Sequence, residues 1–167
     1  MYKRQTFYNH FLDRDDFMHS LAHESLRVIT EQSADDTEGT DPAWRFAVAS
    51  TRVLETGARD PLWGRAVLRL AESPTPLHAA VQQHLRTDLA DGHRTGRFTH
   101  GDDTVTIDLV SGTLMASLRR LVAHDDHRQR YGSAEVIARL LEVLGINHDE
   151  AHTLAAEAED TERTTAN

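Results

Sequence analysis

The sequence predicts an all-α fold, and two observations carry that prediction. Strand signals are nearly absent, because the best β-branched run, Val105-Thr106-Ile107, leads directly into a helical pattern. Helix-starting residues, in contrast, recur along the chain. Asp41-Pro42, Asp60-Pro61 and Thr75-Pro76 each place a capping side chain before a proline at the first helical position. Proline loses little there, since its missing amide would have had no partner.

The individual helices follow in order from such signals. Asp13 is expected to cap the first helix, and Leu12 can meet Phe17 across that cap. Gly57, Gly92 and Gly145 stand where left-handed C-caps would end later helices. We therefore expect helices at about 14–31, 42–56, 61–72, 76–91, 103–123, 133–144 and 148–158. Residues 14–158 would form one ligand-binding and dimerisation domain, followed by a polar, disordered tail over 159–167.

Composition limits the possible classes of protein. A chain of 167 residues is long enough for one domain with its own core. The absence of cysteine excludes disulfides and thiolate metal sites. No apolar run approaches the roughly 18 residues of a membrane span, so a cytoplasmic protein without membrane partners is expected. A net charge of −9 opposes non-specific DNA binding by the chain as given.

Two helices carry more apolar surface than a one-sided helix needs. On a helical wheel of 103–123, one face holds Ile107, Val110, Leu114, Leu118 and Leu121, and the opposite face holds Val105, Leu109, Gly112 and Ala116. The apolar residues of 133–144 also cover more than half of that helix. These patterns predict a homodimer built on a two-fold four-helix interface. The alternative is that both helices are central in a monomer. The predicted interface residues are Val105, Leu109, Gly112, Ala116, Ile137, Leu141 and Leu144.

Several motifs together resemble one known family. Thr6-Phe7-Tyr8-Asn9-His10-Phe11, a turn, Arg14 and an apolar helix resemble the exit of the recognition helix in tetracycline-repressor-like (TetR) transcription regulators. Asp88–Phe98, with its Gly-Arg-Phe ending, resembles the junction before that family's penultimate long helix. Leu140–Ile146 is similar to the close of its last long helix. The order and spacing of these motifs span nearly the whole chain.

The resemblance implies a TetR-like helical regulator in which an N-terminal helix-turn-helix reads operator DNA and the C-terminal domain binds an inducer and dimerises. Residues 1–13 would keep only the tail of that DNA-binding head. The positions that match DNA-contacting residues of the family are Thr6, Tyr8, Asn9, His10 and Arg14. Operator binding is therefore expected only of a full-length parent. A further hypothesis is that Met1–Gln5, which contains the sole lysine, derives from a sequencing adaptor, and the alternative is a wrongly assigned internal start codon.

The inducer itself is not identified by the sequence. In this family the pocket lies among the middle helices, and Trp and Met side chains suit planar apolar ligands. Each candidate can equally be an ordinary core residue. The candidate wall residues are Met18, Trp44, Phe46, Trp63, Leu77, His78, Leu114 and Met115.

Catalytic and metal chemistry are not expected. His19 and His23 are four residues apart, as are His148 and His152, but the sequence implies no third ligand for either pair. No nucleophile elbow, phosphate-binding glycine loop or His-Glu-x-x-His motif is present. The predicted protein is thus a regulator without enzyme activity, cofactor or metal. The alternative function is a stand-alone helical module for dimerisation or small-molecule binding.

Overall fold

The computed structural model describes residues 39–72, 76–123 and 132–165, except for the side chains of 76–81. These ranges form six α-helices and no strand, which confirms the predicted all-α class. The predictions for the first helix and for its cap at Asp13 lie outside the described residues. The helices are α3 (Pro42–Arg59), α4 (Pro61–Glu72), α5 (Pro76–Arg94), α6 (Thr104–Ala123), α7 (Ser133–Val143) and α8 (His148–Thr165).

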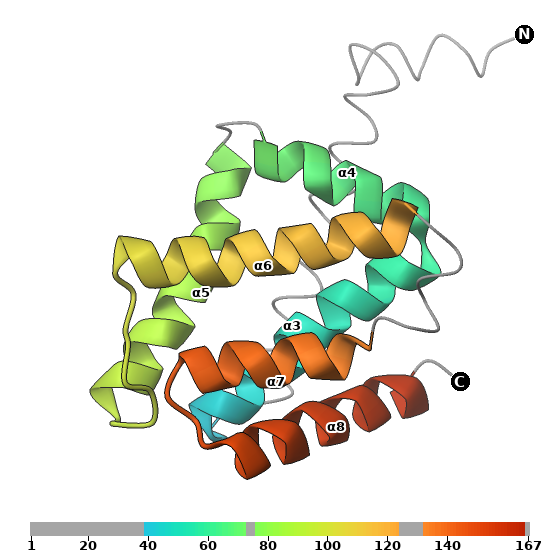
Figure 1. Ribbon diagram of the computed structural model, residues 1–167. Helices are drawn as coiled ribbons and strands as arrows, with labels where there is room; N and C mark the ends of the chain where they lie inside the picture. The colour runs from blue at the N-terminus through green and yellow to red at the C-terminus, as the bar shows by residue number, and fades with distance from the viewer. Residues whose placement is uncertain (1–38, 73–75, 124–131, 166–167) are drawn as a thin grey trace, which may run out of the picture.

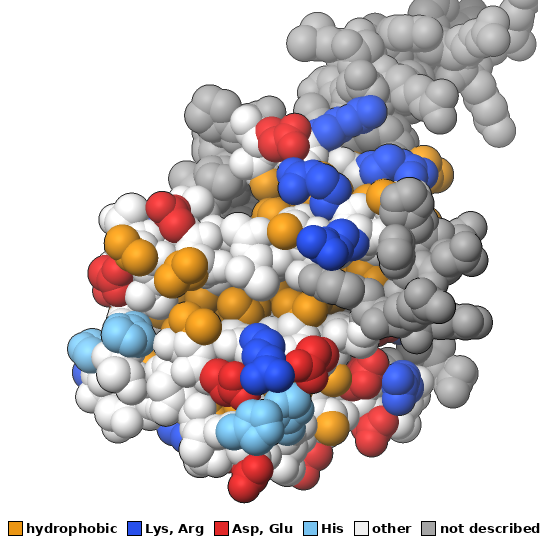
Figure 2. Space-filling model, in the orientation of Figure 1, with side chains coloured by type: hydrophobic (Ala, Val, Ile, Leu, Met, Phe, Trp, Pro, Cys, Tyr) orange, Lys and Arg blue, Asp and Glu red, His pale blue; other side chains and the backbone are white. Residues whose placement is uncertain are grey.

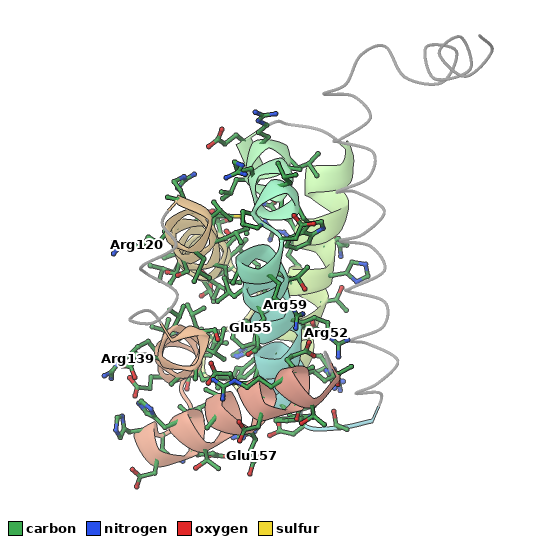
Figure 3. All side chains as sticks on the ribbon, turned by 90° about the vertical axis from the view of Figure 1, so that its right-hand side faces the viewer. Arg52, Glu55, Arg59, Arg120, Arg139 and Glu157 are labelled. Carbon is green, nitrogen blue, oxygen red and sulfur yellow. The ribbon has the colours of Figure 1, made fainter. Side chains whose placement is uncertain are left out.

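Helix α3 is the centre of the arrangement. It packs against α8, α6, α4, α7 and α5. Helices α6 and α7 lie one above the other across one face of the molecule, with α8 next to α7 and α3 behind them (Figure 1). The view turned by 90° shows α6 and α7 end-on at the same outer face (Figure 3). One outer layer of two helices therefore covers the core on this side.

Aspartate side chains cap the N-termini of three helices, and the sequence pattern predicts two of these caps. Asp41 Oδ1 accepts a hydrogen bond from the Ala43 amide at 3.1 Å. Asp60 Oδ1 accepts from the amides of Leu62 and Trp63 at 3.0 and 3.1 Å. Asp103 caps α6 in the same way, although it was not predicted as a cap. These bonds satisfy amides that have no partner inside the helix.

The glycine signals predict one helix end correctly and two wrongly. Gly145 follows α7 with a φ of +102°, which confirms the expected left-handed end. Gly57 and Gly92 lie inside α3 and α5, which end at Arg59 and Arg94. Both glycines serve close packing instead. A Cβ atom on Gly57 would lie 2.2 Å from Leu118 Cδ1, and one on Gly92 would lie 2.0 Å from the ring of Phe98.

Helix α8 is longer than the sequence predicts. It continues to Thr165, so the prediction of a disordered tail was wrong for residues 159–165. The reason is a tertiary contact: Glu162 is buried and accepts a hydrogen bond from Arg52 Nε on α3 at 2.7 Å. Ala158 is fully buried beside the same core. The polar composition of this segment does not reveal that one of its carboxylates has a buried partner.

The loop between α5 and α6 is fixed by the Gly-Arg-Phe segment. Gly96 has a φ of +74°, a conformation that suits glycine. Arg97 then donates two hydrogen bonds to the Asp41 carboxylate, at 2.7 and 2.8 Å, and a third to Glu150. Phe98 is buried with its ring edge-on to Phe46, the centroids 6.4 Å apart. This loop thereby joins the starts of α3 and α8.

None of the described helices is long and apolar enough to cross a membrane.

Candidate ligand-binding core and dimer face

The predicted wall residues that the structure describes all belong to one hydrophobic cluster. Phe46 and Trp63 are buried in it, with 2% and 7% of their surface exposed. Trp44, Leu114 and Met115 are partly buried and pack against the same cluster. They come from α3, α4 and α6, which pack on one another. Met18 and the side chains of Leu77 and His78 lie outside the described residues.

Among the residues of this core that the structure describes, two buried polar atoms have no hydrogen-bond partner. One is the indole Nε1 of Trp63 on α4, and the other is the hydroxyl of Thr51 on α3, a residue with no exposed surface. An unpaired buried donor costs roughly 1–3 kcal/mol, so such groups are uncommon in folded proteins. A small ligand with a hydroxyl or carbonyl oxygen would give the indole N–H an acceptor. Thr51 was not among the predicted site residues, because threonine inside a helix carries no distinctive signal.

The outer face of α6 carries the four residues that the wheel assigns to a partner. Val105 and Leu109 are 67% and 52% exposed, and Gly112 and Ala116 are exposed too. The opposite face holds the buried Ile107, Val110 and Leu118. Figure 2 shows hydrophobic side chains gathered in a band across the face formed by α6 and α7. Water therefore contacts apolar side chains along this side of α6.

The interface prediction needs correction for α7. Ile137, Leu141 and Leu144 have no exposed surface at all, because they pack in the core of the chain itself. They leave nothing for a partner to contact. The outward side of α7 instead presents Val143, which is 44% exposed, and Arg139. Arg139 points to the same side as Arg120 of α6 in Figure 3.

A charged cluster at the start of α3 was missed by the sequence reasoning. Arg45 donates hydrogen bonds to Asp91 Oδ2 at 2.6 Å and to the Thr40 carbonyl at 2.9 Å. Its Nε lies 3.9 Å from Asp88, whose pKa is raised by burial. The cluster ties α3 to α5. It could not be predicted, since Arg45 and its partner Asp91 are 46 residues apart in the sequence.

The residues predicted to contact DNA are not placed by the structure. Thr6, Tyr8, Asn9, His10 and Arg14 all lie outside the described residues. Their assignment rests on the sequence resemblance and remains a prediction.

In the described part of the chain, α3, α4 and α6 enclose an apolar core, and α6 also exposes an apolar outer face. The family model described as "Tetracyclin repressor-like, C-terminal domain" matches residues 41–157. The chain belongs to this tetracycline-repressor-like family of transcription regulators. The resemblance noted in the sequence is thereby confirmed.

Solved structures support the same assignment. The chain is similar to RolR in its complex with the ligand resorcinol, with 26% sequence identity and a TM-score of 0.69 over 90% of this chain and 75% of that chain. RolR without ligand matches with 23% identity and a TM-score of 0.63, over 90% of this chain and 78% of that chain. A comparison with curated protein sequences finds no match.

Proposed function

We propose that the chain is the ligand-sensing and dimerising part of a transcription repressor that small molecules inactivate. The observation that carries the proposal is the unpaired indole N–H of Trp63 inside the core of α3, α4 and α6. A buried apolar site with a few unpaired polar groups is typical of small-molecule binding. The protein would work in the cytoplasm and without enzyme activity.

The expected ligand is a small planar aromatic molecule that carries a hydroxyl group. Its oxygen would accept the hydrogen bond of Trp63 Nε1, and its ring would pack against the apolar side chains of α3, α4 and α6 that surround this indole. The structural similarity to RolR, which was solved with resorcinol, supports this class of ligand. Resorcinol is therefore a suitable first probe.

The active form would be a homodimer that uses the exposed face of α6. Val105 and Leu109 expose apolar surface that a second copy would cover, and the small residues Gly112 and Ala116 would let the helices approach closely. Apolar side chains on neighbouring positions of a helix are typical of an interface between copies.

Ligand would act by shifting the population between two forms of the dimer. In a full-length parent, operator DNA would be read by a helix-turn-helix that includes Thr6, Tyr8, Asn9 and His10, and Arg14, just after it, would contact a phosphate. The two heads of a dimer must match the spacing of the half-sites. A ligand that binds better to a form with a different spacing weakens operator affinity.

Isothermal titration calorimetry with resorcinol tests the ligand proposal. We expect one site per chain in the wild type. The Trp63→Phe variant keeps the aromatic ring but removes the donor, so its affinity should fall by about three- to tenfold. The Leu109→Ala variant, changed on the outer face of α6, should bind as the wild type does. Equal affinities of wild type and Trp63→Phe, or no saturable binding of resorcinol, would contradict the proposal.

A further inference from the structure

Three side chains with metal-binding atoms meet where α7 turns into α8. Glu142 stands near the end of α7, and His148 and His152 occupy the first two turns of α8. One carboxylate oxygen and one nitrogen from each ring all lie within 4.8 Å of one another. Figure 2 shows histidine side chains beside acidic and basic ones over α7 and α8.

The contacts within the cluster converge on one oxygen atom. His148 Nδ1 lies 2.6 Å from Glu142 Oε1, and His152 Nε2 lies 3.8 Å from the same atom. The centroids of the two rings are 4.4 Å apart, and the ring planes are tilted by 57° to one another. Zinc takes nitrogen and carboxylate oxygen ligands at about 2.0–2.2 Å, so two ligand atoms of a tetrahedral site are about 3.3 Å apart. Of the two nitrogen–oxygen distances in the cluster, the one from His148 is shorter than that value and the one from His152 is longer.

The nitrogen of His152 that faces Glu142 has no hydrogen-bond partner. Its Nε2 atom is buried, although the ring as a whole is partly exposed. The other ring nitrogen, Nδ1, lies 3.9 Å from Glu135 Oε2. A carboxylate that accepts a hydrogen bond from the outer nitrogen of a histidine orients the ring for metal binding, and Glu135 would need to approach by about 1 Å to do so. His152 thus has an Nε2 atom without a hydrogen-bond partner among the described residues, and a carboxylate, that of Glu135, on the side of its Nδ1 atom.

We propose that Glu142, His148 and His152 bind one divalent transition-metal ion, with Zn²⁺ as the reference ion. Two imidazoles and one carboxylate are suitable zinc ligands, and a fourth position stays open to water. The ion would connect the end of α7 to the start of α8, across the tight turn at Gly145. The sequence alone showed the histidine pair but not Glu142 as its third ligand.

The charges around the cluster permit such an ion. Arg139 donates hydrogen bonds to Glu142 Oε2 at 3.0 Å and to Glu135 Oε1 at 3.0 Å. Its positive charge is therefore shared between two carboxylates, and the cluster with neutral rings keeps a net negative charge. A glutamate carboxylate is ordinarily ionised at neutral pH, as a metal ligand must be.

Calorimetric titration of the tag-free protein with Zn²⁺ at pH 7.5 tests the site. We expect one ion per chain, with affinity reduced at least about tenfold in His152→Ala and in Glu142→Gln. Glu142→Gln keeps the shape of the side chain, and circular dichroism shows whether each variant is folded. The matched control is the double variant His19→Ala/His23→Ala, which removes a second histidine pair of the same spacing.

Binding of Co²⁺, followed by visible absorption, tests the same site independently. Co²⁺ in a site with nitrogen and oxygen ligands should produce a visible absorption band that saturates at one equivalent and disappears on addition of Zn²⁺. That band should be lost in His148→Ala and kept in the control. The proposal is overturned if zinc affinity is unchanged in His152→Ala and Glu142→Gln, if it falls only in the control, or if the wild type shows no saturable binding.

Discussion

Arg52 on α3 and Glu162 on α8 form a buried ion pair, with Arg52 Nε 2.7 Å from Glu162 Oε1. The two side chains are only 11% and 5% exposed. The pair joins residues 110 positions apart and holds the last turns of α8 on the central helix. Figure 3 shows Arg52 on the side of α3 that faces α8.

Removal of one partner should therefore destabilise the fold strongly. Glu162→Ala removes a carboxylate that is hydrogen-bonded to the buried Arg52 guanidinium, which should lower the free energy of unfolding by about 3 kcal/mol. Glu157→Ala, an exposed position on the same helix, should change it by less than about 0.5 kcal/mol. Urea denaturation followed by circular dichroism measures both. Equal effects of the two variants would show that the pair does not hold α8.

The Asp41–Arg97 pair should make stability depend on pH in the acid range. Burial alone would raise the pKa of Asp41, but the hydrogen bonds from Arg97 and from the Ala43 amide outweigh it and lower the pKa below its usual value of 3.8. Since the folded-state pKa is the lower one, the contribution is complete above pH 3.8 and is lost as the pH falls through the folded-state value. Asp41→Asn keeps an oxygen that can cap α3 but removes this titration. Urea unfolding between pH 2 and 6 should give a flatter profile for the variant, and parallel profiles would contradict the assignment.

A charge on the outer face of α6 should break the proposed dimer. Leu109→Asp places a carboxylate where a second copy would cover an apolar side chain, so the dimer dissociation constant should rise by about thirtyfold or more. Leu62→Asp is the matched control, because Leu62 is 60% exposed but belongs to α4. Sedimentation velocity over a range of concentrations distinguishes the two. A dimer that survives Leu109→Asp and is lost with Leu62→Asp would place the interface on α4 instead.

Two glycines with positive φ differ in how much room surrounds them. A Cβ atom on Gly145 would lie 2.0 Å from Thr99 Oγ1, whereas one on Gly96 would meet nothing within 4 Å. Gly96→Ala should thus cost only the backbone strain, about 1 kcal/mol. Gly145→Ala should lower the free energy of unfolding by clearly more, about 2–3 kcal/mol. The reason is that the loop between α5 and α6, which carries Thr99, must also move away from the end of α7. Thermal unfolding of the two variants gives the comparison, and similar melting temperatures would refute it.

The helix starts could be predicted from sequence because capping is a local interaction. Asp41 and Asp60 each bond to amides two or three residues further along, so the residues that define the cap stand next to one another. The end of α8 could not be predicted, since it depends on Arg52, which lies 110 positions before Glu162 in the sequence. The same reason explains Gly57, whose role is set by the distant Leu118.

In the candidate site, too, the sequence shows the apolar pattern of each helix but not which residues that pattern contacts. A helical wheel shows that α7 has a wide apolar surface, but it cannot tell whether that surface meets the same chain or a second one. The full burial of Ile137, Leu141 and Leu144 resolves this question in favour of the same chain. The unpaired groups of Trp63 and Thr51 are likewise visible only in three dimensions, because their lack of partners depends on the packing of separate helices.

The most direct test of the ligand-sensing function is a nuclear magnetic resonance titration of the two indole N–H groups. The chain contains only Trp44 and Trp63, and the Trp63→Phe variant assigns the two signals. On addition of resorcinol, the Trp63 indole proton should shift downfield as it gains an acceptor, and the shift should saturate at one ligand per chain. A Trp63 signal that stays unchanged at saturating resorcinol would contradict the claim that this core is the sensing site.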